Sequence, residues 1–334
     1  MDPLFLALEL AAAVFFALAA WLALRRGRMP FLELASAAMF GLLLEEGDQL
    51  IFGTYEYAPG FVLAIDRAPL VIGLTWAVII AGAMRITDAL GVRRRWAPFS
   101  DSVLAIMLDL AFDAIAIRIG LWTWRDHVTG TPLSAEAAWF GVPAGNFYAW
   151  LFVTFGFSLL TRWLRERAAP GSRLEWAQLL VPIPAFAILL LSLVPFTILQ
   201  PLIDPTPGGG MLLFLITFAV FLGTAAWGIW GSDRGRPDGQ ATAILDIRLT
   251  FVTRAAIHLF FLWALAISGS ALQLPVLLIV ALALLAAELP LAWLVTMRLG
   301  GDRTRSPSAP RWKANRPSSV DSGGHDPHDL ARLP

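Results

Sequence analysis

Five carboxylate residues lie in two segments that are otherwise apolar enough for a hydrocarbon environment. The first segment carries Glu45, Glu46 and Asp48, and the second carries Asp109 and Asp113. A charged side chain near the centre of a bilayer costs roughly 2.5–3.5 kcal/mol on insertion scales, so such residues usually face a partner or a cavity. The pattern therefore predicts a polar site inside a membrane, where clustered carboxyl groups can exchange protons with a substrate.

The spacing of these residues indicates which of them can act together. Asp109 and Asp113 are four residues apart and share one face of a helix, and Glu45 and Asp48 are three apart, whereas Glu46 points elsewhere. If the two segments touch, up to four carboxyl groups share one pocket. Like charges in a dry site cannot all ionise, so at least one carboxyl group should stay protonated and be available as a proton donor.

The composition predicts a membrane protein. Of the 334 residues, 57% are hydrophobic and only 15% are charged, whereas soluble domains have about 25% charged residues. The formal net charge of zero argues against a general nucleic-acid binder. The chain has no cysteine, which excludes disulfides, thiol catalysis and thiolate metal sites.

The distribution of apolar residues predicts an all-α polytopic membrane helix bundle over residues 1–299. A spanning helix needs about 20 mostly apolar residues, and nine stretches of the chain meet this requirement. They cover approximately residues 3–24, 31–53, 68–90, 101–121, 146–164, 176–199, 210–231, 249–270 and 273–297. Beyond them, residues 300–334 are rich in Pro, Ser, Gly, Asp and Arg, which predicts a disordered cytoplasmic tail. Its two histidines, His325 and His328, are expected to be solvated, so no metal site is predicted.

Charge placement predicts the orientation of the bundle. Arginines gather in every second connection between the nine stretches, and the other connections contain only Arg67 and Arg125. The positive-inside rule then places the N-terminus outside and the C-terminus in the cytoplasm. With a rise of 1.5 Å per residue, Glu45, Asp113 and the start of the helix that begins at Asn146 all fall in the outer half of the membrane.

Aromatic residues accompany the carboxylates at this predicted outer side. Trp122 and Trp124 lie in the connection after the aspartates, and Phe147 and Trp150 open the next helix. Their π-faces suit a conjugated lipid and can stabilise a developing cation. An aromatic belt at the membrane interface is the alternative interpretation.

At these residues the chain resembles the membrane-integral carotenoid biosynthesis family that includes the carotenoid 1,2-hydratases of the bacterioruberin and myxol pathways. The resemblance covers roughly residues 35–160. Its matching features, besides the acidic segments, are Gly53-Thr-Tyr55-Glu-Tyr57, Ala68-Pro69-Leu70 leading to Trp76, Gly120-Leu-Trp122-Thr-Trp124, and Gly141-Val142-Pro143-x-x-Asn146-Phe147-x-x-Trp150.

The resemblance implies addition of water to the terminal 1,2 double bond of an acyclic carotenoid ψ-end group, without a cofactor. Asp109 or Asp113 is then expected to be the acid, Glu45 and Asp48 to position water, and Asn146 to anchor it; the sequence does not rank the two aspartates. Residues expected to bind the substrate are Glu46, Tyr55, Trp122, Trp124, Phe147 and Trp150. The expected partners are a carotenoid lipid, the bilayer and other enzymes of the same pathway, in a bacterial or archaeal cytoplasmic membrane.

Other functions remain open at this point. Asp109-Leu-Ala-Phe-Asp113 has the D-x-x-x-D form found in UbiA-like prenyltransferases, although a first diphosphate motif with an Asn-Asp start is missing. A lycopene-cyclase-like enzyme would use similar carbocation chemistry. A proton-coupled transporter could use the carboxylates as a relay. Arg118 could also neutralise one carboxylate, which would make part of the cluster a structural ion network.

Overall fold

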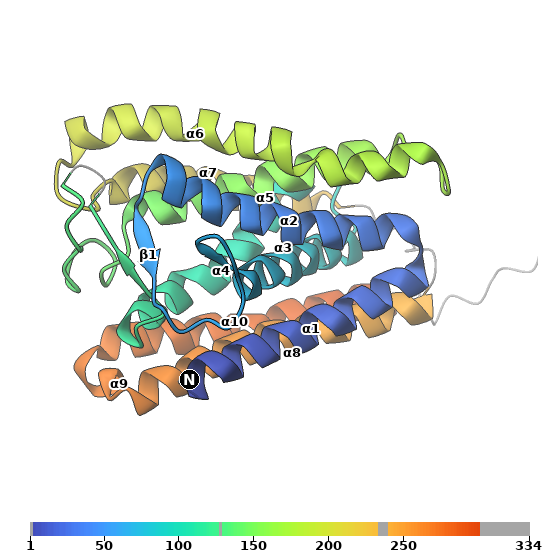
Figure 1. Ribbon diagram of the computed structural model, residues 1–334. Coiled ribbons are helices and arrows are strands. Elements are labelled where there is room, and N and C mark those ends of the chain that lie inside the picture. The colour runs from blue at the N-terminus through green and yellow to red at the C-terminus, as the bar shows by residue number, and fades with distance from the viewer. Residues whose placement is uncertain (1–2, 127–128, 233–239, 301–334) are drawn as a thin grey trace, which may run out of the picture. The chain divides into compact units, whose positions relative to one another are not determined.

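The computed structural model describes residues 3–126, 129–232 and 240–300, and the predicted tail lies almost entirely outside these residues. The described chain is mostly helical (Figure 1). Its long helices are α1 (Pro3–Arg26), α2 (Arg28–Ile51), α3 (Leu70–Ala89), α4 (Ala97–Arg118), α5 (Ala144–Arg165), α6 (Pro182–Ile203), α7 (Met211–Trp230), α8 (Gln240–Ile267) and α10 (Pro275–Gly300). The short helix η1 (Arg173–Leu180) precedes α6, and α9 (Ser270–Gln273) separates α8 from α10.

Seven helical segments of the described chain are long and apolar enough to cross a membrane, which agrees with the predicted membrane bundle. Two long helices, α2 and α4, fall outside this set. They are the helices that carry the five carboxylates, whose polarity lowers their hydropathy. The nine-span count and the orientation of the termini stay predictions.

Helix α4 forms the centre of the bundle. It contacts α3, α5, α7, α8 and α10, and most of its residues are buried, including Asp101, Asp109 and Asp113. Protein surrounds α4, so its acidic side chains can find partners on neighbouring helices and do not have to face lipid tails. This position explains why a helix with three aspartates is compatible with a membrane bundle.

Two small antiparallel sheets lie in the connections, where the sequence predicts no strands. Strand β1 (Tyr55–Tyr57) pairs with β4 (Trp122–Trp124), so that Tyr55 lies opposite Trp124 and Tyr57 opposite Trp122. Strand β2 (Ala64–Ile65) pairs with β3 (Ala68–Pro69). Successive side chains of a strand point to opposite faces, so all four aromatic residues of the β1–β4 ribbon share one face.

Ion pairs connect the helices at the end of the bundle opposite the β1–β4 ribbon. The side chain of Arg162 on α5 is buried and donates hydrogen bonds to the fully buried Asp101 on α4, at 3.0 Å from Nη2 to Oδ2, and to Asp88 on α3. Ser158 on α5 also donates to Asp101, at 2.5 Å. Arg162 therefore joins three helices through one guanidinium group.

Replacement of Arg162 by methionine is expected to destabilise the bundle by about 3–5 kcal/mol, because Asp101 would be left as an uncompensated buried charge. The measurement is the thermal unfolding midpoint of the purified protein in detergent. Arg167→Met is the control, since Arg167 is exposed and lies just beyond the end of α5. Adding Asp101→Asn to Arg162→Met should recover part of the loss, and equal midpoints for the two single variants would contradict the assignment.

Candidate active site

Glu45 on α2 is buried and accepts hydrogen bonds from three different side chains. The hydroxyl groups of Tyr55 and Tyr57 both donate to its Oε2, and the indole N–H of Trp76 on α3 donates to its Oε1 at 2.6 Å. A carboxyl group surrounded by donors is stabilised in its charged form, which only accepts hydrogen bonds. The three donors thus favour the carboxylate form of Glu45 and hold the group in one fixed orientation inside the bundle.

The two tyrosines reach Glu45 because the β1–β4 ribbon presents them on one face. Tyr55 packs edge-on against Trp124 at 5.0 Å between ring centroids, and Tyr57 packs edge-on against Trp122 at 5.8 Å. Burial, together with the neighbouring Glu45 carboxylate, raises the pKa of both tyrosines well above the usual value. Both hydroxyl groups therefore stay protonated and keep donating to Glu45.

Asp109 and Asp113 on α4 meet Asn146 at the start of α5. The Asn146 Nδ2 group donates to Oδ2 of Asp109 at 3.0 Å and to Oδ2 of Asp113 at 2.7 Å. Both carboxyl groups are buried, and Oδ1 of Asp109 has no partner among the described residues. Two buried carboxyl groups that share one amide nitrogen cannot both carry a charge at low cost, so the pair is suited to hold a proton between them.

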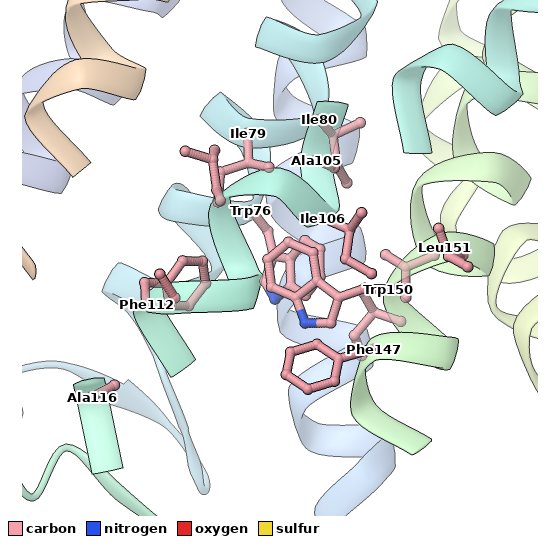
Figure 2. Packing of buried hydrophobic residues seen from close by; sticks show 14 of the residues in the cluster. Trp76, Ile79, Ile80, Ala105, Ile106, Phe112, Ala116, Phe147, Trp150 and Leu151 are labelled. Carbon is pink, nitrogen blue, oxygen red and sulfur yellow. The ribbon is translucent and has the colours of Figure 1, made fainter. Parts of the chain in front are cut away.

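A cavity of about 90 Å³ separates the Glu45 side of the site from the aspartates. Glu45, Asp113 and Asn146 supply its charged and amide groups, and aromatic rings supply most of the remaining wall. Trp76 and Trp150 stand close together there, at 4.0 Å between ring centroids, with Phe112 next to Trp150 (Figure 2). A cavity of this size can hold a few water molecules or a small branched hydrocarbon end.

One polar group in the cavity wall lacks a protein partner. The indole N–H of Trp124 is buried and has no hydrogen-bond acceptor among the described residues. A buried donor without an acceptor is costly, so this group is suited to a bound water or substrate oxygen. The site therefore combines a carboxylate, a proton-holding aspartate pair, a free N–H group and several π-faces.

A family model described as carotenoid biosynthesis protein matches residues 2–216. The chain belongs to this carotenoid biosynthesis family. Searches of curated proteins and of solved structures give no match. The matched region contains every element that supplies a residue to the cavity, whereas α8, α9 and α10 lie beyond it. The resemblance inferred from the acidic and aromatic motifs is thus confirmed at the level of the family.

Seven residues expected from the sequence to form the site of this carotenoid biosynthesis protein line one cavity. They are Glu45, Asp113, Asn146, Tyr55, Trp122, Trp124 and Trp150. Asp109 lies directly behind Asp113 and shares Asn146 with it, but it does not line the cavity. The structure thereby distinguishes the two aspartates, which the sequence does not.

Three other expected site residues lie outside the cavity wall. Asp48 accepts a hydrogen bond from the Thr54 hydroxyl at 2.6 Å and so holds the segment that leads from α2 into β1. Glu46 accepts a hydrogen bond from the backbone N–H of Arg67, and Phe147 packs in the core against Phe214. Asp48 is therefore placed to position the tyrosines, not to touch a ligand in this cavity.

Three aromatic residues that are not predicted from the sequence as site residues also line the cavity, namely Tyr57, Trp76 and Phe112. Tyr57 and Trp76 lie in the motifs that carry the family resemblance, so their position in these motifs could have indicated a role in the site. Phe112 lies between the two aspartates in the chain, where it reads as ordinary helix packing. Arg118, considered as a counter-ion for the carboxylates, instead donates to the backbone carbonyls of Ala135 and Phe140.

Gly41 allows α2 and α3 to approach closely at this site. A Cβ atom on Gly41 would lie 2.6 Å from Cβ of Trp76, which is too close for two carbon atoms. Gly41→Ala should therefore displace Trp76 from Glu45 and destabilise the protein by about 1–3 kcal/mol. The melting temperature and the tryptophan emission maximum measure the effect. Gly223→Ala on α7, where a Cβ meets open space, is the control and should not lower the melting temperature.

Within the described part of the chain, no group of three or more His, Asp or Glu side chains is arranged to hold a metal ion. The acidic residues of the site are bound to Tyr, Trp and Asn donors instead.

Proposed function

We propose that this carotenoid biosynthesis protein adds water to the terminal 1,2 double bond of an acyclic carotenoid ψ-end group. The observation that carries the proposal is the cavity in which Asp113 and the Glu45 carboxylate face the same small space between indole rings. Acid-catalysed hydration of an alkene needs a proton donor, a means of stabilising a cation and a group that accepts a proton from water. Each of these has a candidate in the cavity wall.

In the first step Asp113 transfers its proton to C2 of the double bond, and the electron pair of that bond forms the new C–H bond. A tertiary cation remains at C1. Asp109 supports this step from behind, because Asn146 connects the two aspartates and can follow the shift of charge between them. The aspartate pair thus delivers one proton and keeps the resulting negative charge hydrogen-bonded.

The cation forms next to the faces of Trp76 and Trp150 and close to the negative charge of Glu45. An indole face attracts a cation by about 0.5–2 kcal/mol, and more when water is excluded. The fixed Glu45 carboxylate adds an electrostatic attraction that requires no reorganisation during the reaction. Both effects stabilise the charge-separated state more than the neutral alkene.

In the second step a water molecule attacks C1 and forms the C–O bond, and Glu45 accepts the proton that the water loses. The free N–H of Trp124 and the amide of Asn146 are suited to hold this water. The product is a tertiary alcohol. Return of the proton from Glu45 to Asp113 through cavity water restores the starting state, so the net reaction consumes one water molecule.

The test is expression of the chain in bacteria that accumulate lycopene or another acyclic carotenoid, followed by mass spectrometry of the pigments. Hydration yields products heavier by one or two waters, and a strain carrying the Asp113→Asn variant is the control. An unchanged mass with shifted absorption would indicate cyclisation, and a gain of a five-carbon unit would indicate prenyl transfer. Either result would contradict the proposal, and so would unaltered pigment in every host strain tested, each of which accumulates a different acyclic carotenoid.

A further inference from the structure

A second cavity, of about 80 Å³, adjoins the first one. It lies between α1, α3, α4 and α8. Ile72, Thr75, Phe112 and Trp122 line both cavities, so the two spaces meet at these side chains. The second cavity thus extends directly from the place where the alkene is protonated in the proposed reaction.

The wall of this second cavity is formed mainly by apolar side chains. Its two hydroxyl groups bond to their own helices, since Thr75 donates to the carbonyl of Val71 and Thr253 to that of Leu249, both at 2.9 Å. Both hydroxyl protons are therefore used within the helices, and the remaining wall is aliphatic or aromatic. Such a space suits a hydrocarbon and disfavours an ion or a sugar.

Phe112 stands between the two cavities. Its ring is in edge contact with Trp150, at 5.5 Å between centroids, on the side of the polar cavity. It stacks at 5.2 Å with Phe261 of α8, which lines the apolar cavity. An unbroken series of aromatic faces therefore leads from the carboxylates into the hydrocarbon-lined space.

We infer that the cavity between α1, α3, α4 and α8 binds the isoprenoid chain that follows the reacting end group. The inference rests on the proposed function and extends it. Ala11 is exposed, so the cavity opens on the α1 side, and the rest of a long chain continues there into the bilayer. Helix α8, which lies beyond the residues matched by the family, supplies one wall of this cavity.

Two variants test the inference by filling the cavity from opposite walls. Ala12→Phe acts from α1 and Ala256→Phe from α8, and Ala13→Phe is the control because Ala13 is the exposed neighbour of Ala12. All three substitutions are introduced into the Asp113→Asn variant. For each protein, and for Asp113→Asn alone, the amount of C40 polyene that co-purifies per mole of protein is measured. In the active background, turnover of the C40 substrate is compared with turnover of a C10 acyclic isoprenoid that has the same end group.

Both filling variants should retain at least tenfold less polyene and turn over the C40 substrate at least tenfold more slowly. The C10 rate should stay close to that of the parent protein, which also demonstrates correct folding. Wild-type retention in both variants would overturn the inference while leaving the proposed function intact. If the filling variants retain less polyene but the parent protein hydrates no substrate, the result would support the binding site for the isoprenoid chain and contradict the proposed function.

A measurement on the unaltered protein complements the variants, because a larger side chain can disturb a packed core. An acyclic isoprenoid carrying a photoactivatable diazirine in its chain is irradiated with the full-length protein in lipid nanodiscs, and the labelled peptides are identified. Labels on α1 and on residues 253–261 of α8 are expected. Labels confined to other helices would overturn the inference.

Discussion

Replacing Asp113 by asparagine is expected to lower kcat/KM for hydration by about 10³-fold, whereas the same replacement at Asp109 lowers it by about tenfold. Asp113 lines the cavity and can reach an alkene carbon, so its loss removes the proton donor. Asp109 acts only through Asn146, so its replacement weakens one hydrogen bond. The measurement is the rate of product formation by mass spectrometry at several substrate concentrations.

The contrast between the two aspartates makes this prediction specific. Asp109 and Asp113 share a helix, a partner and a buried environment, so a purely structural effect should be similar for both. Asp113→Glu provides a further check, because it keeps the acid and should retain more activity than Asp113→Asn. Full activity of both asparagine variants would contradict the assignment of the acid, and equal losses would remove the distinction between the residues.

Glu45→Gln is expected to lower kcat/KM by about 10²–10³-fold. Glutamine has nearly the same shape, but it carries no negative charge to stabilise the cation and cannot accept a proton from water. Its amide N–H₂ group would also face hydroxyl and indole donors that now point at a carboxylate. Activity is measured as for Asp113, together with the melting temperature.

Glu56→Gln is the matched control for this change. Glu56 lies on β1 between the two tyrosines, but its exposed side chain pairs with Arg125 on the opposite face of the ribbon. Its replacement should leave the rate within a factor of about two, because an exposed ion pair contributes 0–1 kcal/mol. A similar loss of activity in both variants would indicate that the ribbon fold, and not the Glu45 charge, governs the rate.

Much of the helical architecture could be predicted from the sequence, because runs of about 20 apolar residues leave few alternatives to a helix. The segment predicted at 101–121 is α4 at Ala97–Arg118, and the last two predicted segments are α8 and α10 with the short α9 between them. The predicted and observed ends of the helices differ most where polar residues extend a helix beyond its apolar run. The proximity of Asp109 and Asp113 could also be predicted from the sequence, because their four-residue spacing places them on one face of a helix.

The parts of the site that depend on long-range contacts could not be predicted. The strands of the β1–β4 ribbon have three residues each and lie far apart in the chain, so neither has a readable period of its own. Asp48 shares a helix face with Glu45, but it lies near the last turn of α2, where it bonds to the chain that follows. Spacing within a helix does not reveal what lies beyond the end of that helix.

The β1–β4 ribbon also has an evolutionary consequence. Its two strands are held together by backbone hydrogen bonds, which any residue other than proline can donate. We therefore expect the outward-facing Glu56 and Thr123 to vary between related sequences, and the inward-facing aromatic residues on either side to be retained. In an alignment of related sequences, variable and invariant positions should therefore alternate along both strands. Such a pattern would indicate that selection acts on only one face of this six-residue sheet.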